Sequence, residues 1–168
     1  MIDYIRQIVI GQYGASLAML KDCIAACAPE YWEGMIANGS FRYVAYHTLF
    51  FTDYYLSPNE NAFELRDLHA RGGDEREDQL SPGLSKEDTL AYALICHDKV
   101  EPSLANETVE SLQGPAGFGR RKFSRGELHI YNIRHIQHHT GQLSAYLRRV
   151  DPQRIQKDSL RWIGSGWR

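Results

Sequence analysis

Histidines in two separate segments have the residue type and the spacing of a metal site. His135 and His139 are four residues apart, so on a helix they lie about 40° apart, with Cβ atoms roughly 5–6 Å from each other. His47 lies among aromatic and aliphatic neighbours, where an imidazole without a partner would be costly. We predict that His47, His135 and His139 together bind one divalent metal ion.

This set of ligands is typical of a reactive metal centre. Three neutral imidazoles leave the positive charge of the ion uncompensated and one coordination position open, as in catalytic zinc sites. A water or a thiol at that position has a lowered pKa and is a nucleophile near neutral pH. Imidazole ligands suit zinc, nickel, manganese and iron alike.

Other side chains are placed to assist the three histidines. Tyr131 and Gln142 share the face of His135 and His139, and with Tyr54 they are candidates for orienting a ligand or substrate. His138 is rotated about 60° from His135 and about 100° from His139. We predict that His138 lies beside the metal site or on the surface rather than in the coordination sphere.

The alternative reading is an ordinary helical bundle whose histidines have no common purpose, because an HxxxH pair often arises by chance. His97 is a reserve ligand under the metal hypothesis, but we favour a hydrogen-bonded position in the core. His69 and His129 are predicted to have no role. The basic stretch 119–125 is predicted to be a solvated loop.

The elements that carry these residues are predicted to be helices. Apolar residues recur at three-and-four spacing over residues 2–28, including Ile5 and Ile8. Ser40 is a plausible N-cap for a second helix that ends at Leu56, and no strand pattern is evident. Capping-box patterns begin a third helix at Ser85 and a fourth at Ser124, which runs to about 150.

The segments between the helices complete the predicted architecture. Pro102 predicts a kink or break in the third helix near residue 101. A long polar connection over 59–85, with one short helix near 61–69, joins the second and third helices. The tail 151–168 is expected to pack on the bundle. The fold class is therefore all-α, a four-helix bundle with residues 1–168 as a single domain.

Composition limits the classes of function. The chain has 168 residues, 43% hydrophobic and 24% charged, and 19 basic against 21 acidic residues give a net charge of −2. These values predict a globular, cytoplasmic protein that binds neither membranes nor nucleic acid. The three cysteines, Cys23, Cys27 and Cys96, lack a paired spacing and are predicted to lie in the core.

The segment from His135 to Arg148 resembles the HxxHHxGQLxxYLR motif of the DinB-like superfamily, which includes the YfiT-like metal-dependent proteins. The segment that begins at His47 resembles that family's second helix. The resemblance implies a four-helix bundle in which zinc or nickel is bound by His47, His135 and His139. Thr140 stands where relatives usually have a basic residue, so a role in binding anions is not expected there.

The resemblance also implies an activity. Characterised relatives include thiol-dependent S-transferases and a thiol-dependent isomerase, so the leading hypothesis is a metal-dependent transferase or isomerase. Its cofactors would be a divalent metal and a low-molecular-weight thiol, and its partner a small-molecule substrate. One alternative is a metal-dependent hydrolase, for which no general base is evident beside the histidines and Glu101, on the face of His97, is the nearest candidate. The other is a non-catalytic metal-binding stress-response module that forms a homodimer.

Overall fold

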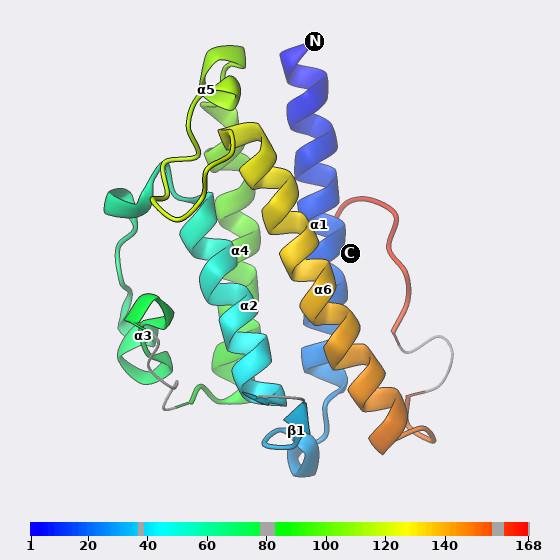
Figure 1. Ribbon diagram of the computed structural model, residues 1–168. Coiled ribbons are helices and arrows are strands. Elements are labelled where there is room, and N and C mark those ends of the chain that lie inside the picture. Colours follow the sequence, from blue (N-terminus) through cyan, green and yellow to red (C-terminus); the bar gives the residue numbers. More distant parts are fainter. Residues whose placement is uncertain (37–38, 78–82, 156–159, 168) are drawn as a thin grey trace.

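The computed structural model describes residues 1–36, 39–77, 83–155 and 160–167 and is built mainly of helices (Figure 1). The helices are α1 (Ile2–Ala26), α2 (Phe41–Leu56), α3 (Asp67–Gly72), α4 (Lys86–Ala105), α5 (Val109–Gln113) and α6 (Arg125–Val150). Three single 3-10 turns are η1 (Pro29–Tyr31), η2 (Glu60–Ala62) and η3 (Glu75–Glu77). Two short strands, β1 (Met35–Ile36) and β2 (Gly39–Ser40), pair antiparallel.

The four long helices form the predicted bundle. α1 packs against α4 and α6, and α2 packs against the same two helices. α2 and α4 run in one direction, while α1 and α6 run in the opposite direction (Figure 1). Because parallel neighbours cannot be joined by a tight turn, residues 57–77 return along the bundle before α4 begins (Figure 1). The prediction of an all-α bundle with a long connection after its second helix is confirmed.

The predicted helix starts are also correct. Ser40 accepts a hydrogen bond from the Tyr43 amide at 3.2 Å, and Ser85 accepts one from the Asp88 amide at 3.0 Å. Ser124 and Glu127 cap the start of α6 reciprocally. These caps satisfy amide groups that have no acceptor within the first helical turn.

Three local features differ from what the sequence pattern suggested. Of the kink or break predicted near residue 101, the break does not occur, since α4 continues through Pro102 to Ala105, and a proline in the last turn disturbs little of the helix that follows it. Ile5 and Ile8 are 41% and 46% exposed, because the first turns of α1 project past the start of α6 (Figure 1). The hairpin of β1 and β2 was not predicted, since two residues a strand are too few to show alternation.

The core between the helices is rich in aromatic side chains. Its largest fully buried members include Tyr13, Tyr46, Tyr92, Phe41 and Phe50. All three cysteines are buried and unbridged, as the sequence predicts. The aromatic character of α2 therefore reflects its position in the bundle, where it packs against both α4 and α6.

Buried Asp53 of α2 anchors the long connection to the bundle. Its carboxylate accepts hydrogen bonds from Lys99 Nζ at 2.5 Å, from Tyr92 Oη at 3.2 Å and from Arg66 Nε at 3.3 Å. Arg66 directly precedes α3, so this contact fixes where the returning segment lies. A buried carboxylate with several charged partners satisfies the requirement that a buried charge be paired.

A second buried network holds the start of α6, and it corrects two predictions. Arg125, expected in a solvated loop, is 4% exposed, and its Nε donates to Glu107 Oε1 at 2.7 Å. His129, expected to have no role, lies 3.3 Å from the same oxygen and 3.2 Å from Tyr13 Oη. Burial alone would raise the pKa of Glu107, but hydrogen bonds from His129, Ser111 and Arg125 lower it to about 2.

We expect Glu107→Gln to lower the free energy of unfolding by about 3–5 kcal/mol at pH 7, because it leaves the Arg125 guanidinium buried without its counter-charge. The folded-state pKa lies below the ordinary 4.5, so this stabilisation is complete above pH 4.5 and disappears as the pH falls through about 2. Denaturant unfolding of the variant and of an exposed control, Glu101→Gln, measures it. Equal stabilities of the two variants would contradict the assignment.

The C-terminal residues lie against α1 and α4. The Gly166 amide donates to the Gly11 carbonyl at 2.8 Å, and the Trp167 ring lies 4.2 Å from the His97 ring. Trp162, in contrast, is 80% exposed. Residues 156–159 of the tail and 78–82 of the long connection lie outside the described residues.

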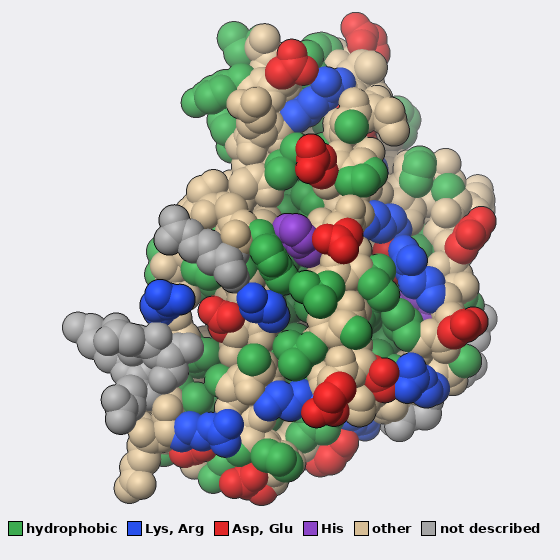
Figure 2. Space-filling view, turned by 180° about the vertical axis from the view of Figure 1, so that it is seen from behind, with side chains coloured by type: hydrophobic (Ala, Val, Ile, Leu, Met, Phe, Trp, Pro, Cys, Tyr) green, Lys and Arg blue, Asp and Glu red, His purple; other side chains and the backbone are tan. Residues whose placement is uncertain are grey.

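The surface and the helices bear on the predicted partners. Figure 2 shows the side opposite to Figure 1, where acidic, basic and apolar side chains are interspersed among the coloured residues. Within the described ranges, no helix combines the length and the apolar character that a membrane span needs.

Candidate metal centre

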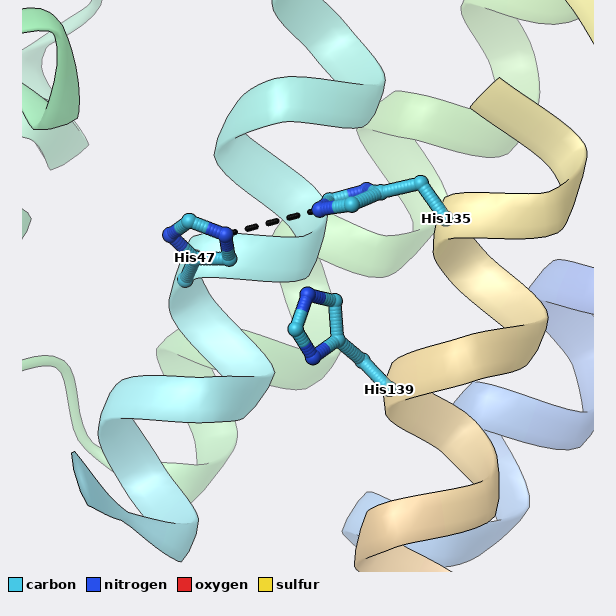
Figure 3. Close-up of side chains that lie close together, drawn as sticks. All are labelled: His47, His135 and His139. Atoms are coloured by element: carbon cyan, nitrogen blue, oxygen red, sulfur yellow. Dashed lines mark hydrogen bonds between the residues drawn. The ribbon is translucent and has the colours of Figure 1, made fainter. Parts of the chain in front are cut away.

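The three predicted ligands meet at the contact between α2 and α6. His47 projects from α2 toward His135 and His139, which lie one turn apart on α6 (Figure 3). The Nε2 atoms of His47 and His135 are 3.4 Å apart. Each of the three residues offers one nitrogen, and these three atoms lie within 4.8 Å of one another.

These separations fit a single metal ion. Two nitrogens that bind one zinc ion at tetrahedral angles lie about 3.3 Å apart, and the His47–His135 pair is already at this spacing. The nitrogen offered by His139 lies within 4.8 Å of the other two, so its side chain would move inward to complete the group. The group is the cluster of potential metal ligands found among the described residues.

Two of the rings have a hydrogen-bond partner at Nδ1, which favours the tautomer that leaves Nε2 free to bind a metal. His47 Nδ1 lies 3.2 Å from Glu75 Oε2, and His139 Nδ1 lies 2.8 Å from Gln142 Oε1. Both partner atoms are acceptors, so a neutral ring at either position would carry its proton on Nδ1 and present the lone pair of Nε2. Metal-binding histidines usually have such a partner. Gln142 was a sequence candidate for this role.

Glu75 was missed by the sequence analysis. It stands in a run of charged residues that resembles a solvated loop, yet it is only 6% exposed. Tyr46 holds this part of the connection through a hydrogen bond from its hydroxyl to the Gly73 carbonyl. Gly72 permits this approach, because a side chain there would collide with the Tyr46 ring. The glycine pair before the charged run was the available signal.

Burial keeps the α6 histidines neutral. It lowers the pKa of His135 to about 2, with smaller contributions from His139 and His47. Burial also lowers the pKa of His139 to about 4, although its hydrogen bond to Gln142 acts in the opposite direction. Both rings are therefore unprotonated at pH 7, the state in which an imidazole binds a metal. His135 Nδ1 is buried without a partner among the described residues.

Aromatic rings enclose the cluster. Phe51 packs edge-on against His47 with ring centres 4.8 Å apart, and Tyr131 stacks on His135 with ring centres 6.4 Å apart. Tyr131 thus occupies its predicted position. Among the described residues, Tyr54 makes no ring contact with the three histidines. Its ring centre lies 6.1 Å from that of Phe51, and it lines the adjoining cavity.

The other histidines lie outside this group. His138 is exposed, with its ring 5.0 Å from that of His139. His97, the reserve ligand, stacks on Trp167 and lies 3.0 Å from Asp98 Oδ1. His69 was expected to have no role, but it is buried and lies 2.9 Å from Tyr92 Oη, so it joins the network around Asp53.

A cavity of about 280 Å³ adjoins the cluster. Two of its lining residues, Phe51 and Glu75, also contact His47. The rest of its wall comes from α2, the long connection and the loop before α6. None of the three histidines lines the cavity itself, so Phe51 and Glu75 lie between a molecule in the cavity and the ring of His47.

The fold and the site define a class, helical-bundle proteins with a three-histidine cluster between two of the long helices. The family model described as DinB family matches residues 22–162, a range that includes α2, α4, α6 and all three histidines. The chain belongs to the DinB family. Comparisons with curated proteins and with solved structures give no significant match.

The hydrogen bonds around the cluster predict the tautomers of two rings. In metal-free protein at pH 7, long-range ¹H–¹⁵N NMR spectra should show His139 protonated at Nδ1, and likewise His47 when its ring is neutral. Glu75→Ala should remove this preference at His47 alone, and Gln142→Ala at His139 alone. Glu64→Ala, an exposed site in the same connection, is the control. A neutral ring of His47 or His139 that carries its proton on Nε2 in wild type would contradict the geometry.

Proposed function

We propose that this DinB family protein binds one zinc or nickel ion with His47, His135 and His139 and uses it to activate a low-molecular-weight thiol. The reaction would be a transfer of, or an isomerisation assisted by, that thiol. The observation that carries the proposal is the group of three imidazoles between α2 and α6, close to a cavity whose wall includes Phe51 and Glu75.

The donor set favours catalysis over a structural role. A structural zinc site is usually closed by four protein ligands and often includes thiolates, whereas this cluster contains three histidines and all three cysteines lie in the core. A bound ion would keep its full positive charge and an open position, and would lower the pKa of a thiol or water there.

Residues of the chain supply the remaining requirements. Phe51 and Tyr131 cover the rings of His47 and His135 and limit the access of water. Glu75 and Gln142 orient two ligand rings through their Nδ1 protons. Because these partners are fixed before a substrate arrives, the site would need little rearrangement to act.

The cavity also bears on the alternative functions. A non-catalytic metal-binding module has no need of a space beside the ion, so the cavity of about 280 Å³ favours an enzyme. Metal-dependent hydrolysis is the second candidate. Glu75 is a carboxylate in contact with His47, a position for which the sequence had suggested only the more remote Glu101. One oxygen of Glu75 is buried without a described partner.

The metal hypothesis predicts a specific pattern of binding. Protein purified without a histidine tag should contain close to one equivalent of metal by elemental mass spectrometry. His47→Ala and the double variant His135→Ala/His139→Ala should lose it, because too few ligands remain. His138→Ala should retain it, since His138 is outside the cluster. Retention of metal by the ligand variants, or its loss from the His138 variant, would contradict the assignment.

The thiol hypothesis predicts a spectroscopic response. Cobalt-substituted protein should develop a sulfur-to-cobalt charge-transfer band when cysteine, glutathione or coenzyme A is added, because cobalt accepts the same imidazole ligands. Serine, the oxygen analogue of cysteine, should produce no such band. A metal-loaded protein that shows no response to any of these thiols would exclude thiol activation and leave hydrolysis as the better candidate.

A further inference from the structure

We propose that the cavity lined by Phe51 and Glu75, close to the three histidines, binds a molecule that carries a carboxylate, held by Arg120 and Arg121. This inference names the class of ligand for the proposed site and, in its thiol form, rests on the proposed function. Under the thiol hypothesis, the activated thiol would belong to a molecule that also carries a carboxylate group.

The walls of the cavity suit an apolar chain or a flat group. Phe51, Tyr54, Tyr55 and Phe118 line it, and their rings pack on one another, with Tyr54 and Phe118 at 4.7 Å. Such mutually packed rings form a rigid surface. Specificity within an apolar pocket then depends on the few polar groups that point to it.

Most charged groups in the wall already have a partner. Arg76 lies against Asp74, with its Nη2 2.7 Å from Oδ2. Glu60 accepts a hydrogen bond from the Gly119 amide at 2.9 Å, which fixes the loop that carries the two remaining arginines. Glu75 is the partner of His47. Among the residues that the structure describes, no carboxylate forms an ion pair with Arg120 or Arg121.

Arg121 is held in place without using up its charge. Its Nε and Nη2 donate to Tyr55 Oη at 3.1 and 2.6 Å, and its guanidinium carbon lies 4.7 Å from the centre of the Tyr131 ring. A guanidinium has five N–H donors in one plane, so several remain for a ligand. A pre-positioned guanidinium is complementary to a carboxylate, which it can bind with two hydrogen bonds.

The charges also give the cavity a direction. The wall also holds Glu60, which accepts from the Gly119 amide, and Arg76, which is paired with Asp74. Glu75, in contact with His47, would repel a carboxylate, whereas the two arginines without a described ion-pair partner, Arg120 and Arg121, would attract it. The anionic end of a ligand would therefore lie at the loop before α6, and its other end would lie toward His47 and His135. Tyr131 contacts both Arg121 and His135, so the arginine and the histidine cluster are separated by a single tyrosine ring.

The test compares mercaptohexanoate with its neutral analogue mercaptohexanol on cobalt-substituted protein, with the charge-transfer band as the readout of binding. We expect the acid to bind at least tenfold more tightly, since hydrogen bonds to charged groups contribute on this scale. The preference should vanish in Arg120→Gln/Arg121→Gln, be partly retained in Arg121→Lys, and be unchanged in Arg134→Gln, an exposed control on α6. Equal affinities for acid and alcohol in wild type would overturn the inference.

A second arm separates this inference from the thiol hypothesis. Hexanoate and hexanol, which lack sulfur, are titrated into metal-free protein and followed by NMR shifts of residues that line the cavity. Shifts with hexanoate that are lost in the arginine double variant support the carboxylate site even when no thiol reaches the metal. An absence of any difference between hexanoate and hexanol overturns the carboxylate site even when thiols do bind cobalt.

Discussion

The packing of α2 against α6 is the contact on which the candidate centre depends. His47 comes from one helix and the HxxxH pair from the other, so the three nitrogens converge only when both helices present these faces to each other. The same contact buries His135 and His139, which lowers their pKa values and keeps the imidazoles neutral. The packing of these two helices therefore sets the positions of all three ligands and the neutral state of the two on α6.

The direction of the helices adds a second constraint. Because α2 and α4 are parallel, the chain must return along the bundle between them, and this return is the source of Glu75. Asp53 and Tyr46 tie the returning segment to α2, so the carboxylate is delivered to His47 by contacts within the core. The long connection thus supplies the hydrogen-bond partner of His47, whereas the partner of His139, Gln142, comes from α6 itself.

The sequence predicted what periodicity and capping determine. The spacing of His135 and His139, the caps at Ser40, Ser85 and Ser124, and the apolar stripes depend on local geometry, so they could be derived without tertiary information. The two arginines at 120 and 121 lay in a stretch that reads as a solvated loop, although Arg121 packs on two tyrosine rings. Such contacts arise only when distant segments meet.

The buried networks escaped prediction for the same reason. His129 lies on α6, whereas its partner Glu107 lies in a different segment, so the sequence around His129 gives no sign of this contact. Ile5 and Ile8 fit the apolar period of α1, yet they are exposed because α1 extends beyond the start of α6. The spacing of apolar residues identifies one face of a helix, but it does not show how far along that face the neighbouring helix extends.

X-ray absorption spectroscopy of the metal-loaded protein, purified without a histidine tag, tests the central claim most directly. The account predicts three imidazole nitrogens at about 2.0–2.1 Å from a zinc ion, with a lighter ligand completing the sphere and a sulfur at about 2.3 Å only after a thiol is added. A spectrum with sulfur ligands before thiol addition, or without imidazole scattering, would contradict it.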